Sequence, residues 1–190
     1  MSWQFTTTKN AIIKAKKIGN GAYGDVFKCD EGRVYKIFQA RTSPYREFIS
    51  LKTFEDQCEA YIKAQKSQSL SGLVPRYYGI HELSKIEYLN KDMTSSYYPA
   101  CCYSIEYIER IATFEESNAF KERHETEFHT HGIMYTEDCE IRKSSDGFKM
   151  IDFGIRGVIE RIEELCDYNE ANFNDAIKNT FNQEWEIGVR

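Results

Sequence analysis

The chain has 190 residues, of which 41% are hydrophobic and 29% charged, and its formal net charge is −5 at neutral pH. This size and composition suit one globular domain or two small lobes with a real core, and they exclude a collagen-like or disordered chain. The acidic balance, with both signs of charge interspersed, argues against a nucleic-acid partner held on a basic surface.

No apolar run approaches membrane-spanning length, and the first ten residues, MSWQFTTTKN, lack the apolar core of a secretory signal. The six cysteines are scattered without C-x-x-C spacing, which favours reduced thiols over a disulfide scaffold. We therefore expect a protein of the cytoplasm without a membrane span, or one delivered into a host cytosol by a specialised secretion route.

A glycine-rich stretch follows residues 10–18, which we expect to form a short strand or to lead into a hairpin. Gly19, Gly21 and Gly24 have the spacing G-x-G-x-x-G, and Val26 follows two residues later. A dinucleotide-binding loop of this spacing would open a helix, whereas here β-branched and aromatic residues flank an Asp-Glu-Gly turn. The glycines are therefore expected in a strand-turn-strand unit.

Lys36 lies on the second strand of this hairpin. Glycines without Cβ atoms can fold over a polyphosphate, and the Lys36 ammonium can then neutralise phosphate charge. At this point the sequence resembles the protein kinase family, whose signature is G-x-G-x-x-G-x-V followed by a strand of V-A-I-K type. Residues 34–37, VYKI, match that strand with Tyr in place of Ala. Taken alone, the stretch also fits a glycine-rich turn with a surface lysine.

Residues 48–65, FISLKTFEDQCEAYIKAQ, carry apolar side chains at helical spacing and follow a linker that contains Pro44. In the kinase family, a helix at this place carries a glutamate that pairs with the strand lysine. The resemblance assigns that role to Glu59, and Glu55, one turn earlier on nearly the same face, is the reserve. A solvent-facing carboxylate is the alternative for Glu59.

Residues 81–89 and 100–108 are expected to form two further strands, separated by the polar loop NKDMTSS. The second resembles the strand that enters the hinge between the two lobes of a kinase. That resemblance implies Ile105 as the gatekeeper, and it implies that Glu106 and Ile108 offer backbone C=O and N–H groups to an adenine ring.

Residues 112–130 predict a strongly charged helix. Three histidines gather at its end, His124, His129 and His131, but no cysteine is suitably spaced, so zinc is a minor alternative.

Residues 131–138, HGIMYTED, resemble the kinase catalytic loop, which typically reads G-I-x-H-x-D. Direct alignment puts Glu137 in the place of the catalytic aspartate, and Asp138 lies one residue further along. Either carboxylate could orient an acceptor hydroxyl, or neither does and the protein binds nucleotide without transferring phosphate. Glu140 lies nearest the place of the metal-binding asparagine of the family.

Residues 148–154, FKMIDFG, match the strand and D-F-G motif of kinases. The resemblance implies that Asp152 binds the Mg²⁺ that bridges the nucleotide phosphates, since hard Mg²⁺ prefers carboxylate oxygen. The 36 residues after Gly154 lack the A-P-E segment and the large helical half of ordinary kinases. Two amphipathic helices, around residues 158–165 and 173–181, are expected instead.

Together these resemblances imply an α+β protein with a bilobal kinase-like fold. Residues 1–108 would form a five-stranded antiparallel sheet with one helix, and residues 109–190 a truncated helical lobe. The implied activity is ATP- and Mg²⁺-dependent phosphate transfer to a Ser, Thr or Tyr hydroxyl of a protein substrate, by a minimal kinase similar in size to pathogen effector or viral kinases. The alternatives are a nucleotide-binding pseudokinase that serves as an interaction module, and a kinase-like transferase of another group such as AMP or a glutamyl unit.

Overall fold

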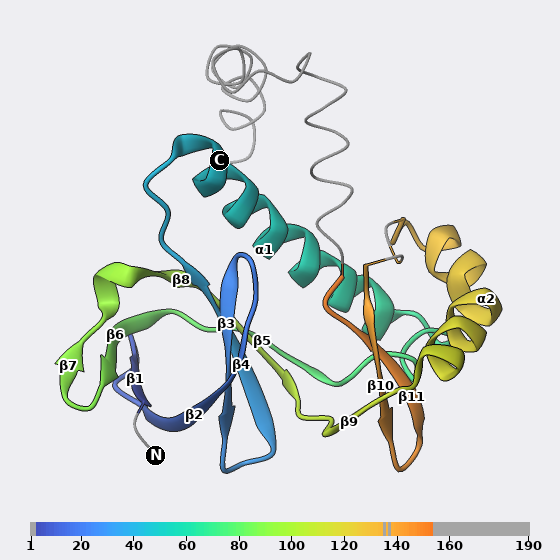
Figure 1. Ribbon diagram of the computed structural model, residues 1–190, viewed down its shortest axis with the longest axis horizontal. Coiled ribbons are helices and arrows are strands. Elements are labelled where there is room, and N and C mark those ends of the chain that lie inside the picture. The colour runs from blue at the N-terminus through green and yellow to red at the C-terminus, as the bar shows by residue number, and fades with distance from the viewer. Residues whose placement is uncertain (1–2, 135, 137, 154–190) are drawn as a thin grey trace.

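A computed structural model of the chain describes residues 3–134, 136 and 138–153. These residues form a mixed α+β fold with a large antiparallel sheet, a small second sheet and two α-helices (Figure 1). The α+β class predicted from the sequence is therefore confirmed. The two helices expected after Gly154 lie outside the described residues.

The large sheet has eight strands in the order β5-β8-β4-β3-β2-β1-β6-β7, each antiparallel to its neighbours. In chain order the strands are β1 (Trp3–Thr7), β2 (Ile12–Asn20), β3 (Gly24–Cys29), β4 (Arg33–Gln39), β5 (Tyr77–Ile80), β6 (Leu83–Tyr88), β7 (Lys91–Asp92) and β8 (Tyr97–Glu106), with a short 3₁₀ helix, η1 (Thr94–Ser96), before β8. The sheet is larger than the five strands expected from the sequence, which did not include β1, β5 and β7: β5 and β7 are short, and β1 lies at the very start of the chain.

Helix α1 (Pro44–Lys66) covers one face of the large sheet. It begins at a proline, which suits the first turn because its missing N–H has no intrahelical partner there. Its inward face packs Phe54, Cys58 and Tyr61 into a core shared with the sheet. Ile62, next to Tyr61 in the sequence, is exposed.

Strand β4 shows how the two faces of the sheet are divided. Val34 and Phe38 belong to the core under α1, whereas Tyr35 and Ile37 belong to a second core on the opposite face. Because side chains alternate along a strand, Lys36 must point to the α1 face. The alternation therefore directs Lys36 into the interior space between the sheet and α1.

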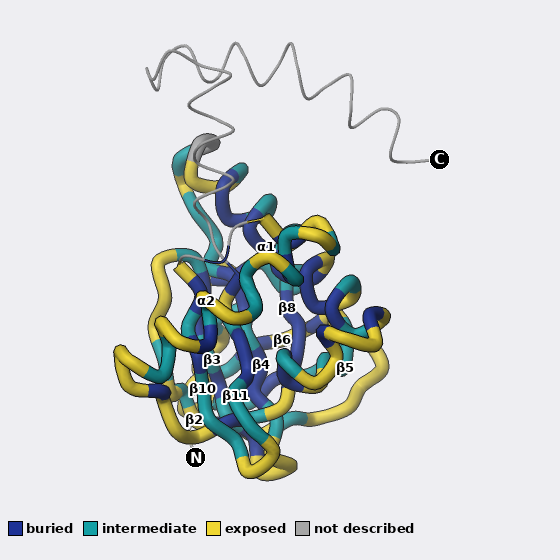
Figure 2. The backbone as a smooth tube through the Cα atoms, turned by 90° about the vertical axis from the view of Figure 1, so that its right-hand side faces the viewer, coloured by how far each residue is buried: buried dark blue, intermediate teal, exposed yellow. Residues whose placement is uncertain are grey.

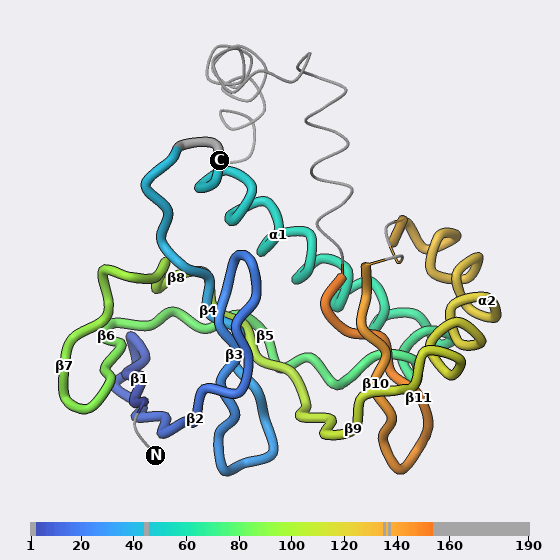
Figure 3. The backbone as a smooth tube through the Cα atoms, in the orientation of Figure 1, coloured from blue at the N-terminus to red at the C-terminus, as the bar shows by residue number. Residues whose placement is uncertain are grey.

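The small sheet has the order β11-β10-β9, built from β9 (Arg110–Ile111), β10 (Glu140–Ser144) and β11 (Gly147–Ile151). Helix α2 (Phe114–Thr130) begins with a capping box in which the Thr113 and Glu116 side chains and backbone N–H groups bond reciprocally. Figure 3 follows the chain from β8 through β9 into α2.

One core cluster joins the large sheet and α1 to α2 and the small sheet. It contains Tyr103 of β8, Tyr61 of α1, Phe128 of α2 and Met150 of β11. Figure 2 shows the buried residues concentrated along α1, β3, β4 and β8. In the described part of the chain, no helix is long and apolar enough to cross a membrane.

Candidate functional site

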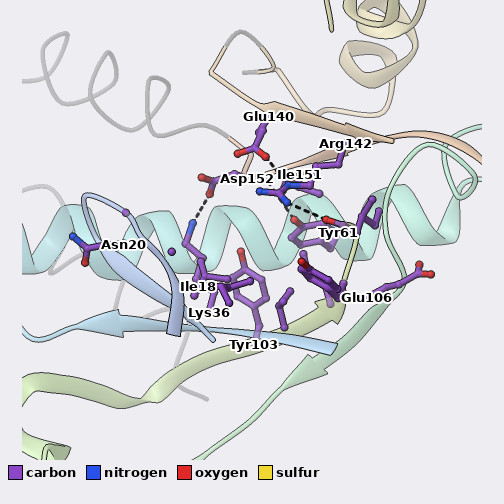
Figure 4. A pocket seen from close by; sticks show the side chains of 17 residues that line it. Ile18, Asn20, Lys36, Tyr61, Tyr103, Glu106, Glu140, Arg142, Ile151 and Asp152 are labelled. Atoms are coloured by element: carbon purple, nitrogen blue, oxygen red, sulfur yellow. Dashed lines mark hydrogen bonds and ion pairs between the residues drawn. The ribbon is translucent and has the colours of Figure 1, made fainter. Parts of the chain in front are cut away.

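A cavity of about 310 Å³ lies between the glycine hairpin, the middle of the large sheet and the end of β11 (Figure 4). Its volume is at the lower end of the range of small-molecule sites, roughly 300–1,000 Å³. Most of the residues predicted for a nucleotide site line it: Gly19, Gly21, Val26, Lys36, Glu106, Ile108, Glu140 and Asp152. Segments far apart in the sequence therefore meet at one cavity.

Lys36 and Asp152 form an ion pair across this cavity. The Lys36 side chain is 13% exposed and that of Asp152 is 53% exposed, so the ammonium is held inside while the carboxylate faces open space. One residue comes from the large sheet and the other from the segment after β11. The pair thus joins the two sheets where a charged ligand can reach both groups.

Asp152 has a backbone conformation that L-residues seldom adopt. Its φ is +57°, in the left-handed region, which aspartate tolerates better than most residues. Its backbone N–H donates a hydrogen bond to the Tyr61 hydroxyl at 3.4 Å. Burial raises the pKa of Tyr61 well above its ordinary value, so this hydroxyl stays protonated and neutral. Backbone outliers of this kind concentrate at functional sites.

Behind the cavity lining, a second residue of α1 contacts the segment that carries Asp152: Gln57, which is 1% exposed. Its Nε2 donates to Asp152 Oδ1 and to the Phe153 carbonyl oxygen, both at 2.9 Å. Its Oε1 accepts a hydrogen bond from the Tyr103 hydroxyl at 2.8 Å. Sequence reasoning missed Gln57 because the search was for a carboxylate, although helical spacing puts it between Phe54 and Tyr61 on the inward face.

The prediction that Glu59 pairs with Lys36 is wrong in this structure. The Glu59 side chain is 60% exposed and pairs with Lys63 one turn later at 2.7 Å. The hydrogen bond from Lys63 lowers the pKa of Glu59 below its ordinary value. The reserve, Glu55, pairs with Lys52 at 3.3 Å. Both carboxylates lie on the solvent side of α1, since the inward face is occupied by apolar residues and Gln57.

The glycine turn between β2 and β3 is tight enough to require its glycines. The Gly21 N–H donates to the Gly24 carbonyl oxygen at 2.8 Å, and a Cβ on Gly24 would lie 2.9 Å from the Ile37 carbonyl oxygen. Gly24 itself does not line the cavity but allows β3 to approach β4. From outside, the Arg41 guanidinium donates to the Ala22 carbonyl oxygen at the tip of the turn.

A buried carboxylate lies directly after the glycine turn, at the start of β3. Asp25 is 1% exposed and accepts hydrogen bonds from the Tyr97 hydroxyl at 2.7 Å and Gln39 Nε2 at 3.0 Å. Lys17 Nζ lies 2.7 Å from the same carboxylate. These partners satisfy the charge of Asp25, which therefore joins β2, β4 and β8 to its own strand β3 and is not available as a catalytic group.

The residues expected to meet an adenine ring line the far end of the cavity. The Glu106 side chain extends away from the cavity and accepts from the Arg76 backbone N–H at 3.3 Å, and the Glu106 N–H donates to the Arg76 carbonyl oxygen at 2.8 Å. The Ile108 carbonyl oxygen accepts from Arg142 Nη1 at 3.0 Å. Arg142, which sequence reasoning did not single out, therefore already binds the carbonyl oxygen of Ile108, one of the residues whose backbone was expected to face a base.

The two candidate catalytic carboxylates are placed differently. Glu137 lies outside the described residues. Asp138 is exposed and is absent from the described lining of the cavity. Thr136, which precedes both of them, is buried, and its hydroxyl donates to Glu125 Oε1 on α2 at 3.1 Å. This bond fixes the chain just before Asp138 to α2.

The carboxylates predicted for a metal, Asp152 and Glu140, both line the cavity, and Glu140 pairs there with Arg142. Among the described residues no group of three His, Cys, Asp or Glu side chains could hold a metal ion, which includes the histidines considered for zinc. Mg²⁺ that binds with a nucleotide needs only one or two protein carboxylates, because phosphates and water complete its coordination. The donor set fits Mg²⁺ bound together with phosphates better than a metal held by protein alone.

Comparison of the sequence with models of known protein families and with curated proteins gave no match in either case.

Proposed function

We propose that the chain is a reduced protein kinase-like enzyme that binds ATP and Mg²⁺ in this cavity and transfers the γ-phosphate to a Ser, Thr or Tyr hydroxyl of a protein. The observation that carries the proposal is the meeting of Lys36 and Asp152 across a cavity with a glycine turn at its edge. A cation, an anion and a glycine turn around one space suit a polyphosphate with a bound metal.

The proposal includes a division into two lobes. Strands β5, β8, β4, β3 and β2 are neighbours in the large sheet and, with α1, would form the five-stranded first lobe within residues 1–108. Strands β1, β6 and β7 would be an extension of its far edge. Residues 109–190, which include the small sheet and α2, would form the second lobe. The cavity then lies between the lobes.

Each group in the cavity has a distinct part in the proposed reaction. Lys36 would neutralise the phosphate charge, and the backbone of the glycine turn would hold the phosphates in position. Asp152 and Glu140 are the carboxylates that would hold Mg²⁺. When bound, Mg²⁺ supplies positive charge to the phosphate oxygens. Glu137 or Asp138 would orient the acceptor hydroxyl, so most of the rate would come from positioning and charge neutralisation.

Without nucleotide, Lys36 and Asp152 satisfy each other. Binding would exchange this pair for two new ones, lysine with phosphate and aspartate with metal. Val26 and Val34, which also line the cavity, offer apolar contact to a base.

Transfer of radiolabel from γ-labelled ATP to protein tests the proposal, with the full chain and a mixture of acceptor proteins. We expect Lys36→Ala and Asp152→Ala to reduce the label by roughly a hundredfold or more, as loss of a main charge-stabilising group does. Lys52→Ala, which removes an ammonium that pairs with Glu55 and Asp56 on the solvent side of α1, is the matched control and should keep the activity. Equal label in all four proteins would refute phosphate transfer at this site.

A nucleotide-binding pseudokinase is the second candidate, and the exposed position of Asp138 outside the cavity lining favours it. Thermal stabilisation by ATP and Mg²⁺ without label transfer would support this reading, because a ligand that binds only the folded state raises its stability. The intact mass of a labelled acceptor separates phosphate transfer from transfer of AMP.

A further inference from the structure

We propose that Gln57 is the positioning residue that holds Asp152 ready for a divalent cation, and that Tyr103 fixes the orientation of its amide. This inference rests on the proposed function, because it assigns Asp152 to the metal. It differs from the expectation drawn from the sequence, in which a glutamate of the same helix holds the lysine.

The hydrogen bonds of the Gln57 amide leave one orientation. Asp152 Oδ1 and the Phe153 carbonyl oxygen can only accept, so Nε2 must face them in the segment after β11, and Oε1 then accepts from the Tyr103 hydroxyl. Gln57 and Tyr103 are 1% and 2% exposed, so water cannot replace these bonds readily. Both hydrogens of the amide nitrogen are used, and the network is fully satisfied.

A neutral amide suits this place better than a carboxylate would. Asp152 Oδ1 already pairs with Lys36, and a carboxylate at position 57 would repel it and the Phe153 carbonyl oxygen, since an ionised acid can only accept. The amide donates to Asp152 and adds no charge. Asp152 can therefore exchange the ammonium of Lys36 for a cation while the bond from Gln57 persists.

Helix α1 holds the backbone of Asp152 as well as its side chain. The Tyr61 hydroxyl, one helical turn after Gln57, accepts a hydrogen bond from the Asp152 N–H. Gln57 binds the carboxylate and the carbonyl oxygen of the next residue. Together these contacts hold Asp152 at its left-handed φ of +57°, a conformation that persists only where the surroundings enforce it.

Titration calorimetry with a non-hydrolysable ATP analogue, in EDTA and then at increasing Mg²⁺ concentrations, tests the inference on the full chain. The variants are Gln57→Met, Gln57→Glu and Tyr103→Phe, with Gln65→Met, two turns further along α1, as the control. We expect the Gln57 variants to bind the analogue in EDTA within about twofold of the wild type. In these variants the Mg²⁺ concentration needed to tighten binding of the analogue should rise about tenfold or more, because a hydrogen bond to a charged group contributes about that factor. Tyr103→Phe should shift it in the same direction by less, and Gln65→Met should not shift it.

Either of two results would overturn the inference. The first is that folded Gln57 variants show the same Mg²⁺ dependence as the wild type. The second is that their affinity for the analogue falls equally with and without Mg²⁺, which indicates a merely structural role. If the Gln57 variants do not fold, as judged by circular dichroism, Tyr103→Phe decides the test, because it removes one hydroxyl and adds no volume. A wild-type chain that binds no analogue would overturn the proposed function itself, and the inference with it. Failure of the inference alone would leave the Mg²⁺ dependence of the wild type intact.

Discussion

Lys36 is held by its position in a strand, and Asp152 by its contacts with a helix. The alternation of side chains along β4 turns Lys36 to the face that α1 covers. Asp152 follows the last residue of β11, and its orientation depends on hydrogen bonds from Gln57 and to Tyr61. Strand geometry therefore places Lys36, whereas hydrogen bonds place Asp152. Substitutions near Lys36 should act through the sheet, and substitutions near Asp152 should act through those hydrogen bonds.

Glu59→Gln tests the corrected role of the helix carboxylate. We expect label transfer and Mg²⁺-ATP binding within about twofold of the wild type, because Glu59 contacts Lys63 on the solvent side of α1. The free energy of unfolding should change by no more than about 0.5 kcal/mol, the usual range for an exposed pair within one helix. A loss of activity as large as that of Lys36→Ala would show that Glu59 reaches the lysine during the reaction.

His81 gives stability a pH dependence that one substitution should remove. Its Nε2 lies 2.7 Å from Ser104 Oγ, and burial, with a further contribution from Arg33, lowers the pKa of His81 below its ordinary value of 6.5. As pH falls below about 6.5 the unfolded chain takes up this proton before the folded chain does, so stability is full above that pH and decreases below it.

The comparison is between the wild type and His81→Gln, whose amide can still bond to Ser104. Urea unfolding at about pH 7.5 and about pH 5.5 should show a larger loss of stability for the wild type, since the other titrating groups are common to both proteins. Equal losses would mean that His81 is protonated to the same degree in the folded and unfolded chains.

Among the elements, the β3–β4 hairpin and α1 were predictable, because their signals are local. β-Branched and aromatic residues around an Asp-Glu-Gly turn mark the hairpin, and apolar periodicity marks the helix. The inward face of α1 was harder to predict, since it includes buried polar residues, Gln57 among them. Helical periodicity of apolar residues cannot identify a buried amide whose partners come from elsewhere in the chain. In α2, the apolar Phe114 lies in the first turn and is 77% exposed.

Gly24→Ala tests how closely β3 must approach β4 at the glycine turn. The new Cβ would lie 2.9 Å from the Ile37 carbonyl oxygen, so backbone must move, and we expect the free energy of unfolding to fall by about 1–3 kcal/mol. Gly72→Ala is the control, because its Cβ would meet nothing within 4 Å, and it should be neutral or stabilise by up to about 1 kcal/mol. Urea unfolding measures both. Equal effects of the two substitutions would show that the approach of β3 to β4 does not need a glycine.

At the scale of the whole molecule, one core cluster runs from the large sheet under α1 to the small sheet. The α+β class followed from the sequence, but the pairing of β1 with β6, and with it the eight-stranded sheet, did not. Such pairing joins segments about eighty residues apart, and no local pattern specifies it. The same applies to the site: the motifs identified Lys36 and Asp152, whereas the contacts of Gln57 and Arg142 exist only after the chain is folded.

A structure of the full chain with a non-hydrolysable ATP analogue and Mg²⁺ would show directly whether Lys36 and Asp152 bind the nucleotide and its metal. We expect the phosphates to lie between the glycine turn and Lys36, Lys36 to have left Asp152, and Asp152 to bind the metal while Gln57 still donates to it. An analogue bound elsewhere, or a Lys36–Asp152 pair unchanged at saturating analogue and Mg²⁺, would contradict this expectation.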